Sequence, residues 1–269
     1  MIIVAERVNA TRKAIARAIR EHDEAHIRKE IQAQDEAGAH YIDLNAGLGS
    51  GDRERESKDL SWLIDLALET TEKKLALDTS DPDVLMRAAQ YLGDRRPMLL
   101  NSVTGEPERL QALMPLAARL ECPVIGLSMS GTGIPTSPDD RLAVCDAILT
   151  AAKDAGVPAG NIFLDPLVLP LCSDVAQGGV TLATLQAIKT RYPEARTIMG
   201  LSNVSHGLPR RAVINRGFLI AALAYGLDAA ICDPTDAGTR QAAAVGELVA
   251  GRDRHCRKFT RLVRQGVIA

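Results

Sequence analysis

Residues 36–47 read EAGAHYIDLNAG, and this stretch shows the pattern that decides the fold. Gly38 follows a helix-like segment, Tyr41 and Ile42 form a short apolar run, and the run ends on Asp43 and Asn45. Glycine is favoured just past the end of a helix, because it adopts a left-handed backbone without strain. The stretch therefore predicts a helix, a turn and a buried strand whose far end is polar.

Seven further short apolar runs repeat this pattern along the chain. They occupy residues 2–5, 75–77, 98–100, 124–127, 162–164, 197–199 and 229–231. Continuous apolar runs are typical of parallel strands that are buried on both faces. The residues that follow them are polar in nearly every case, and include Glu6, Asp78, Asn101, Ser128, Asp165, Asn203 and Asp233.

Helix-like stretches separate the runs, at residues 14–21, 25–37, 57–71, 82–92, 106–120, 139–155, 181–192 and 215–225. Regular alternation of strand and helix is the signature of βα repeats. The chain has 269 residues, the usual size of one eight-stranded barrel. We therefore predict the α/β class and a single-domain (β/α)₈ TIM barrel over residues 1–269, with loops at 167–180 and 204–211 near its mouth.

The composition excludes several classes of protein. The formal net charge is −2, which gives no general attraction to nucleic acid or to an anionic membrane. The first apolar run is too short for a signal peptide, and no run is long enough to span a bilayer. The five cysteines are scattered and form no zinc or disulfide pattern. We expect a cytoplasmic protein without a metal site of its own.

The polar strand ends indicate what the barrel binds, because a TIM barrel keeps its active site at the C-terminal ends of its strands. The set consists of Asp43, Asn45, Asp78, Asn101, Asp165 and Asn203. It contains no Lys or Arg, which argues against a phosphate site. A carboxylate accepts two parallel N–H donors, so the set suits the amidine-like edge of a pterin. The alternative is that these residues only tie down loops.

Several phrases in order along the chain carry a family resemblance. They are AERVN at 5–9, DLN at 43–45, LDT at 77–79, NS at 101–102, DPL at 165–167 and GLSNVS at 200–205. Together they resemble the pterin-binding methyltransferases, and most closely the methyltetrahydrofolate:corrinoid (iron–sulfur) protein methyltransferases. The folate domain of cobalamin-dependent methionine synthase is a further relative. The resemblance extends from Ile2 to about Lys258.

The resemblance implies roles for individual residues. Asp78, Asn101 and Asp165 would hydrogen-bond the pterin edge, and Asn203 would be the catalytic group near the pterin N5. The remaining substrate-binding residues would be Asp43, Asn45, Gly200, Ser202 and Arg211. Arg210 is an alternative to Arg211, because the spacer that precedes them differs from the family pattern. His206 could contact the corrinoid or remain a polar loop residue.

The activity that the family implies is methyl transfer between N5 of methyltetrahydrofolate and the cobalt of a corrinoid. It would proceed by in-line displacement with Co(I) as nucleophile, and N5 would be activated by hydrogen bonding or protonation. A corrinoid-binding module does not fit beside a barrel of this length, so a separate corrinoid protein would carry the cobalamin. The family further implies a homodimer, with no nucleic-acid or membrane partner.

Two other functions remain open at this point. One is a pterin enzyme like dihydropteroate synthase, although strand two lacks the expected Gly-Gly-Ser-Thr type loop and strand seven lacks a lysine. The other is a folate-binding subunit without catalysis. The sequence also leaves open the direction of methyl transfer and the identity of the final donor or acceptor.

Overall fold

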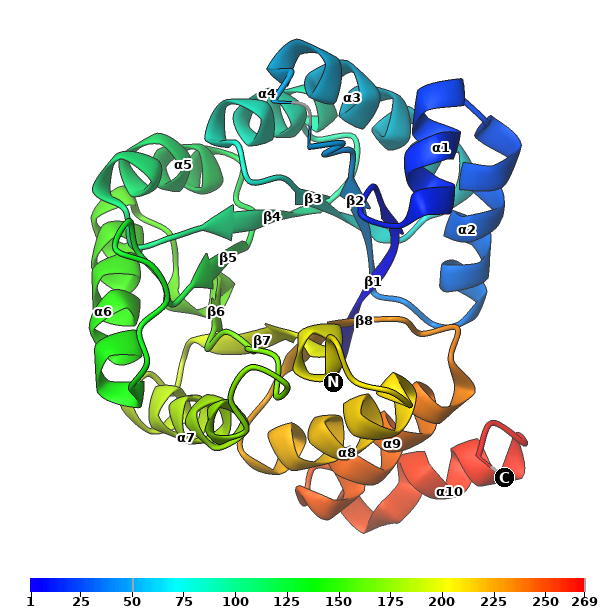
Figure 1. Cartoon of the computed structure of the whole chain (residues 1–269), viewed down its shortest axis with the longest axis vertical. Helices are drawn as coiled ribbons and strands as arrows, with labels where there is room; N and C mark the ends of the chain where they lie inside the picture. The colour runs from blue at the N-terminus through cyan, green and yellow to red at the C-terminus, as the bar shows by residue number, and fades with distance from the viewer. Residues whose placement is uncertain (50, 269) are drawn as a thin grey trace.

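A computed structural model of the protein describes residues 1–49 and 51–268. Eight parallel strands pair in chain order and close into a barrel, with β8 beside β1. Figure 1 shows the strands at the centre and the helices around them. The strands are β1 (Ile2–Asn9), β2 (Tyr41–Asn45), β3 (Lys74–Asp78), β4 (Met98–Val103), β5 (Val124–Leu127), β6 (Ile162–Asp165), β7 (Arg196–Gly200) and β8 (Ala229–Cys232). The predicted fold is confirmed.

Most helices lie where the sequence predicts them. They are α1 (Lys13–Glu21), α2 (Glu24–Glu36), α3 (Arg53–Thr70), α4 (Pro82–Leu92), α5 (Pro107–Arg119), α6 (Pro138–Ala155), α7 (Ala176–Arg191), α8 (Arg211–Ala224), α9 (Ala237–Val249) and α10 (Arg257–Arg264). The loop expected at 167–180 is shorter, because α7 already begins at Ala176. Likewise, Arg211 is the first residue of α8 rather than part of a loop.

Capping residues explain where several helices begin. Asp81 accepts hydrogen bonds from the backbone N–H groups of Asp83 and Val84, with Pro82 in the first turn, as the sequence predicts. Asp236 caps α9 in the same way. Helix α9 was not among the predicted helices, because its buried face consists largely of alanines and small residues give little apolar periodicity.

The interior of the barrel is filled by a cluster of apolar side chains, with one buried member from each strand. The cluster consists of Val4, Tyr41, Ala76, Leu99, Ile125, Phe163, Ile198 and Ala229. All eight are buried, so the barrel is a packed core and not a pore. The C-terminal end of the barrel therefore has a solid floor.

The next inward-facing position of each strand follows from the two-residue period of a strand. Two residues beyond their members of the apolar cluster, the eight strands carry Glu6, Asp43, Asp78, Asn101, Leu127, Asp165, Gly200 and Ile231. Register shifts interrupt the ladder between Ala5 and Val8 in β1, and between Asn101 and Val103 in β4. Such bulges re-aim side chains beside active sites. The fold thus brings polar side chains from distant parts of the chain onto one surface.

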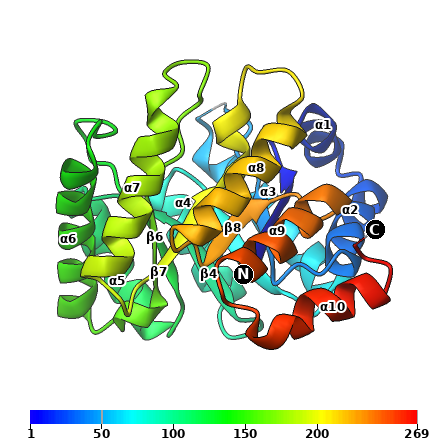
Figure 2. The same ribbon diagram turned by 90° about the horizontal axis from the view of Figure 1, so that it is seen from below.

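The two ends of the barrel differ in the elements that surround them. Figure 2 shows the β6–α7 and β7–α8 connections at one end and α10 at the other. The β7–α8 connection contains a short 3₁₀ helix, η2 (Leu201–Ser205), which carries Asn203. Across the described residues, each helix is too short or too polar to cross a membrane.

Candidate active site

A cavity of about 800 Å³ opens at the C-terminal end of the barrel. Its lining includes seven of the predicted site residues, namely Asp43, Asp78, Asn101, Gly200, Ser202, Asn203 and Arg211. Within the described part of the chain, Asn45 and Asp165 are not in this lining. The lining also includes Glu6, Asn9, Arg12, His206, Asn215, Asp233 and Asp236, which were not among the predicted site residues. Four of the six polar strand-end residues therefore meet at one cavity, and the other two, Asn45 and Asp165, lie outside its lining.

Asp43 and Asp78 lie deep in the cavity and are held by amides. The Asn101 Nδ2 donates to Asp43 Oδ1 at 3.3 Å, and the Asn45 Nδ2 donates to Asp78 Oδ2 at 2.9 Å. Burial raises the pKa of both carboxyls, and the charge of Asp78 raises the pKa of Asp43 further. Asn45 thus positions a cavity carboxyl instead of lining the cavity.

Glu6 is a cavity carboxyl that the predicted site set left out. Its Oε2 accepts a hydrogen bond from the Ser202 hydroxyl at 3.2 Å, which joins β1 to η2. Burial raises the pKa of Glu6 from 4.5 to about 7, against the opposing effect of this hydrogen bond. The period of β1 could have identified Glu6, because it follows the inward-facing Val4 by two residues.

Asp165 is buried beside the cavity and is fixed by the turn that follows β6. Its Oδ1 accepts a hydrogen bond from the Leu167 backbone N–H at 2.8 Å. Burial raises the pKa of Asp165 to about 7. The fully buried guanidinium of Arg141 braces this turn by donating to the carbonyls of Pro166 at 2.7 Å and Leu167 at 3.0 Å. This cation also favours the ionised form of Asp165.

Asn203 presents an exposed amide at the edge of the cavity. A Cβ on Gly200 would lie 3.3 Å from the Asn203 Nδ2, so the missing side chain leaves room for this amide. Arg211 stabilises η2 from the next helix, donating to Ser205 Oγ at 3.1 Å and to the Ser202 carbonyl at 2.7 Å. The amide therefore sits on a braced 3₁₀ helix.

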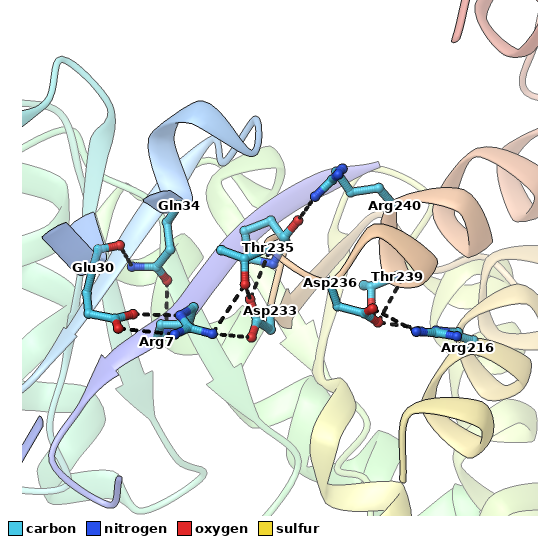
Figure 3. A network of polar contacts seen from close by, with 10 residues as sticks. Arg7, Glu30, Gln34, Arg216, Asp233, Thr235, Asp236, Thr239 and Arg240 are labelled. Carbon is cyan, nitrogen blue, oxygen red and sulfur yellow. Dashed lines mark hydrogen bonds and ion pairs between the residues drawn. The ribbon is translucent and has the colours of Figure 1, made fainter. Parts of the chain in front are cut away.

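The wall of the cavity near β8 is built from a polar network, shown in Figure 3. Arg7 extends from β1 and bonds both Glu30 Oε2 at 2.6 Å and Asp233 Oδ2 at 2.9 Å. Arg216 donates to Asp236 Oδ1 at 2.7 Å, and so joins α8 to the start of α9. Asp233 and Asp236 are thus paired with arginines of the protein. They form part of the cavity wall and are not free to accept hydrogen bonds from a ligand.

Comparison with known proteins identifies the family. A family model described as pterin binding enzyme matches residues 5–233. The chain belongs to the pterin-binding enzyme family. This family member is 33% identical to the methylcorrinoid:tetrahydrofolate methyltransferase of Eubacterium limosum, over 100% of this chain and 98% of that protein. It is also 27% identical to the methionine synthase of Mycobacterium tuberculosis, over 86% of this chain but only 20% of that protein.

Solved structures with the same fold include dihydropteroate synthases. The enzyme of Stenotrophomonas maltophilia matches with a TM-score of 0.70 and 19% identity, over 92% of each chain. The enzyme of Xanthomonas albilineans matches with a TM-score of 0.69 and 21% identity, over 92% of each chain. Identities this low show that the fold is shared, and nothing about the reaction.

Proposed function

We propose that this pterin-binding enzyme transfers a methyl group between a corrinoid carried by a separate protein and N5 of tetrahydrofolate. The observation that carries the proposal is the 33% identity with the Eubacterium limosum enzyme, which covers the whole of this chain. That enzyme's name puts methylcorrinoid as the donor, and we propose the same direction here. We further propose that residues 1–269 act as one catalytic unit and assemble as a homodimer, which light scattering would test.

The deep carboxyls suit the donor-rich edge of the pterin. A ring at this depth would meet Asp43, Asp78 and the Asn101 amide, which lie on neighbouring strands. Among the residues that the structure describes, Asp43 and Asp78 make no salt bridge, so pterin N–H groups would replace the hydrogen bonds to water that burial removes. Asp165 would add a further acceptor if its turn admits the ring edge. This arrangement supports binding of a neutral heterocycle better than binding of a phosphate.

Asn203 is the group that we assign to N5. The corrinoid supplies an activated methyl group when its carrier protein docks. As N5 accepts the methyl group, its lone pair would form the new N–C bond while the cobalt–carbon bond of the substrate breaks and leaves its electron pair on cobalt. The nitrogen would be positively charged until its N–H proton leaves. The Asn203 carbonyl would accept a hydrogen bond from that N–H, which is strongest while the charge is present. Glu6, with a pKa of about 7, is the cavity carboxyl best matched to exchange the proton.

The test is an anaerobic single-turnover reaction between a methylated corrinoid protein and tetrahydrofolate. We expect the protein to accelerate the change in cobalt absorbance and to yield 5-methyltetrahydrofolate by chromatography. Folate binding without acceleration would show a passive binding subunit and would overturn the proposal. Formation of dihydropteroate from para-aminobenzoate and dihydropterin pyrophosphate would instead support the synthase function.

A further inference from the structure

A buried arginine connects the elements next to Asp165. Arg141 lies near the start of α6, and its side chain is completely buried. Its guanidinium donates to neutral oxygens: the carbonyls of Pro135 at 2.9 Å, Pro166 at 2.7 Å and Leu167 at 3.0 Å, and Gln177 Oε1 at 3.2 Å. These oxygens belong to the β5–α6 loop, the β6–α7 turn and α7, which lies beside α6 (Figure 1). One cation therefore holds three segments together.

The charge of Arg141 is not neutralised by a direct partner. Within residues 1–49 and 51–268, it forms no salt bridge with a carboxylate. Burial lowers the pKa of Arg141, and the charge of Asp165 raises it. Burial raises the pKa of Asp165, and Arg141 is among the groups that lower it. Burying an unpaired cation costs free energy, so the action of this charge on Asp165 is the feature that a neutral side chain would lack.

The β6–α7 turn that Arg141 holds contains an unfavourable backbone conformation. Leu167 has a φ of 65°, in the left-handed region that residues with a side chain rarely adopt. Its carbonyl accepts hydrogen bonds from Arg141 and from Thr181 Oγ1, the latter at 2.9 Å. Its N–H donates to Asp165 Oδ1 at 2.8 Å. Leu167 therefore links the guanidinium to the carboxyl through its own two backbone groups.

Two other arginines hold turns at this end of the barrel, but they are less buried. Arg109, in α5, is half-buried and donates to the Ser102 carbonyl at 3.0 Å. Arg211 is exposed and donates to the Ser202 carbonyl. Water screens an exposed charge, so Arg141 is the one of these three whose charge acts most strongly on a neighbouring carboxyl.

We propose that Arg141 is a positioning residue for folate recognition: it fixes the β6–α7 turn so that Asp165 is presented to the pterin edge as an ionised acceptor. The inference rests on the proposed function, in which Asp165 receives a donor of the ring. Arg141 acts in two ways, by holding the Leu167 backbone and by its charge. Both actions pass through Asp165, so removal of Arg141 cannot cost more folate affinity than removal of the Asp165 carboxylate.

The experiment is a double-mutant cycle in tetrahydrofolate affinity, measured by calorimetry. Arg141→Met removes the guanidinium and keeps an unbranched apolar chain. In the otherwise unaltered protein, this change should weaken binding by about tenfold, since a carboxylate acceptor loses its alignment. In the Asp165→Asn background the same change should weaken binding by less than about twofold, because the carboxylate on which Arg141 acts is already absent.

Arg141→Lys is the second variant, and it carries the test if the methionine variant fails to fold. It keeps the positive charge but loses the planar fork that reaches several carbonyls. Binding should weaken by about threefold, again only when Asp165 is present. In both Arg141 variants the rate of methyl transfer at saturating tetrahydrofolate should fall by less than about threefold, because Asp165 is assigned to the ring edge and not to N5.

A matched control removes an arginine with similar contacts at the other end of the barrel. Arg96 is half-buried and donates to the carbonyls of Thr71 at 2.6 Å and Lys73 at 3.3 Å, before β3 begins. Arg96→Met should lower the midpoint of denaturant unfolding, as Arg141→Met should, but should leave tetrahydrofolate affinity unchanged. A loss of affinity in this control would attribute the effect to general destabilisation and overturn the inference.

The remaining outcomes separate this inference from the proposed function. Equal losses of affinity with and without the Asp165 carboxylate, in a protein that transfers methyl groups, would overturn the inference alone. The expected coupling in a protein that binds tetrahydrofolate but transfers no methyl group would support the inference and overturn the proposed function. Absence of tetrahydrofolate binding by the unaltered protein would overturn both.

Discussion

One carboxylate at the N-terminal end of the barrel and two carboxyls at the C-terminal end differ in the partners that the fold gives them. At the N-terminal end, Asp228 accepts hydrogen bonds from Lys189 Nζ and the Thr197 backbone N–H, both at 3.0 Å. At the C-terminal end, Glu6 is half-buried and Asp165 is buried, and the described residues provide neither with a salt-bridge partner.

This difference separates the end where a carboxylate is paired within the protein from the end that bears the candidate active site. A charged group that only stabilises the fold is expected to have a partner within the protein, because burying an unpaired charge costs folding free energy. Where carboxyls are left with raised pKa values, the partner is expected from outside. Substitutions at the C-terminal end should therefore change folate binding and catalysis, whereas those at the N-terminal end should change stability alone.

The largest effect is expected at Asn203. Asn203→Ala removes a group that we assign to the transition state, so the rate of methyl transfer should fall by about 10² to 10³. The folate dissociation constant, measured by calorimetry, should change by less than about threefold. Equal losses in rate and affinity would contradict the assigned role.

Glu6→Gln should stabilise the protein at alkaline pH. The pKa of Glu6 rises from 4.5 to about 7 on folding, so its contribution to stability is complete below pH 4.5 and is lost as the pH rises through 7. The variant lacks this loss and should gain up to about 3 kcal/mol over the unaltered protein between pH 4.5 and 8. Denaturant unfolding across this range measures the gain, and a difference independent of pH would refute the burial argument.

Asp165→Ala should weaken folate binding, by roughly 10- to 100-fold, because the pterin edge would lose an acceptor. Asp165→Asn is the matched variant, since it keeps one carbonyl oxygen and should lose less affinity. Calorimetry decides the matter. If the alanine variant binds folate normally, Asp165 holds its loop and does not reach the ring.

The smallest effect is expected at the N-terminal end. Asp228→Asn leaves the Lys189 ammonium without its carboxylate and should lower the free energy of unfolding by about 1 to 2 kcal/mol at pH 7. Folate affinity and methyl transfer should stay unchanged. A change in either would show that the two ends are coupled, and the comparison would fail.

The fold was largely predictable because it follows from local patterns. Each apolar run became a strand, and Asp81 with Pro82 begins α4 as predicted. Helix α9 was missed because Ala242, Ala243 and Ala244 bury a face without large apolar side chains. Small residues allow helices to pack closely against one another. Such packing leaves no periodic pattern of large apolar residues in the sequence.

The candidate site was predictable in part. The strand ends identified Asp43, Asp78 and Asn101 as residues that meet, and the structure places all three in the cavity. Asn45 and Asp165 carry the same sequence signal but lie outside the lining of the described cavity. Polarity at a strand end predicted which end of the barrel bears the polar cavity, but the exact reach of each side chain depends on turns and bulges.

The sequence by itself determined the order of strands and helices and the end of the barrel that bears the polar groups. Both follow from the periods of the backbone, which act over a few residues. Only the tertiary structure decided which charges are neutralised, as Asp233 is by Arg7 across 226 positions of the chain. It also decided which are left desolvated, as Glu6 is, because burial and ion pairing depend on residues that only the closed barrel brings together.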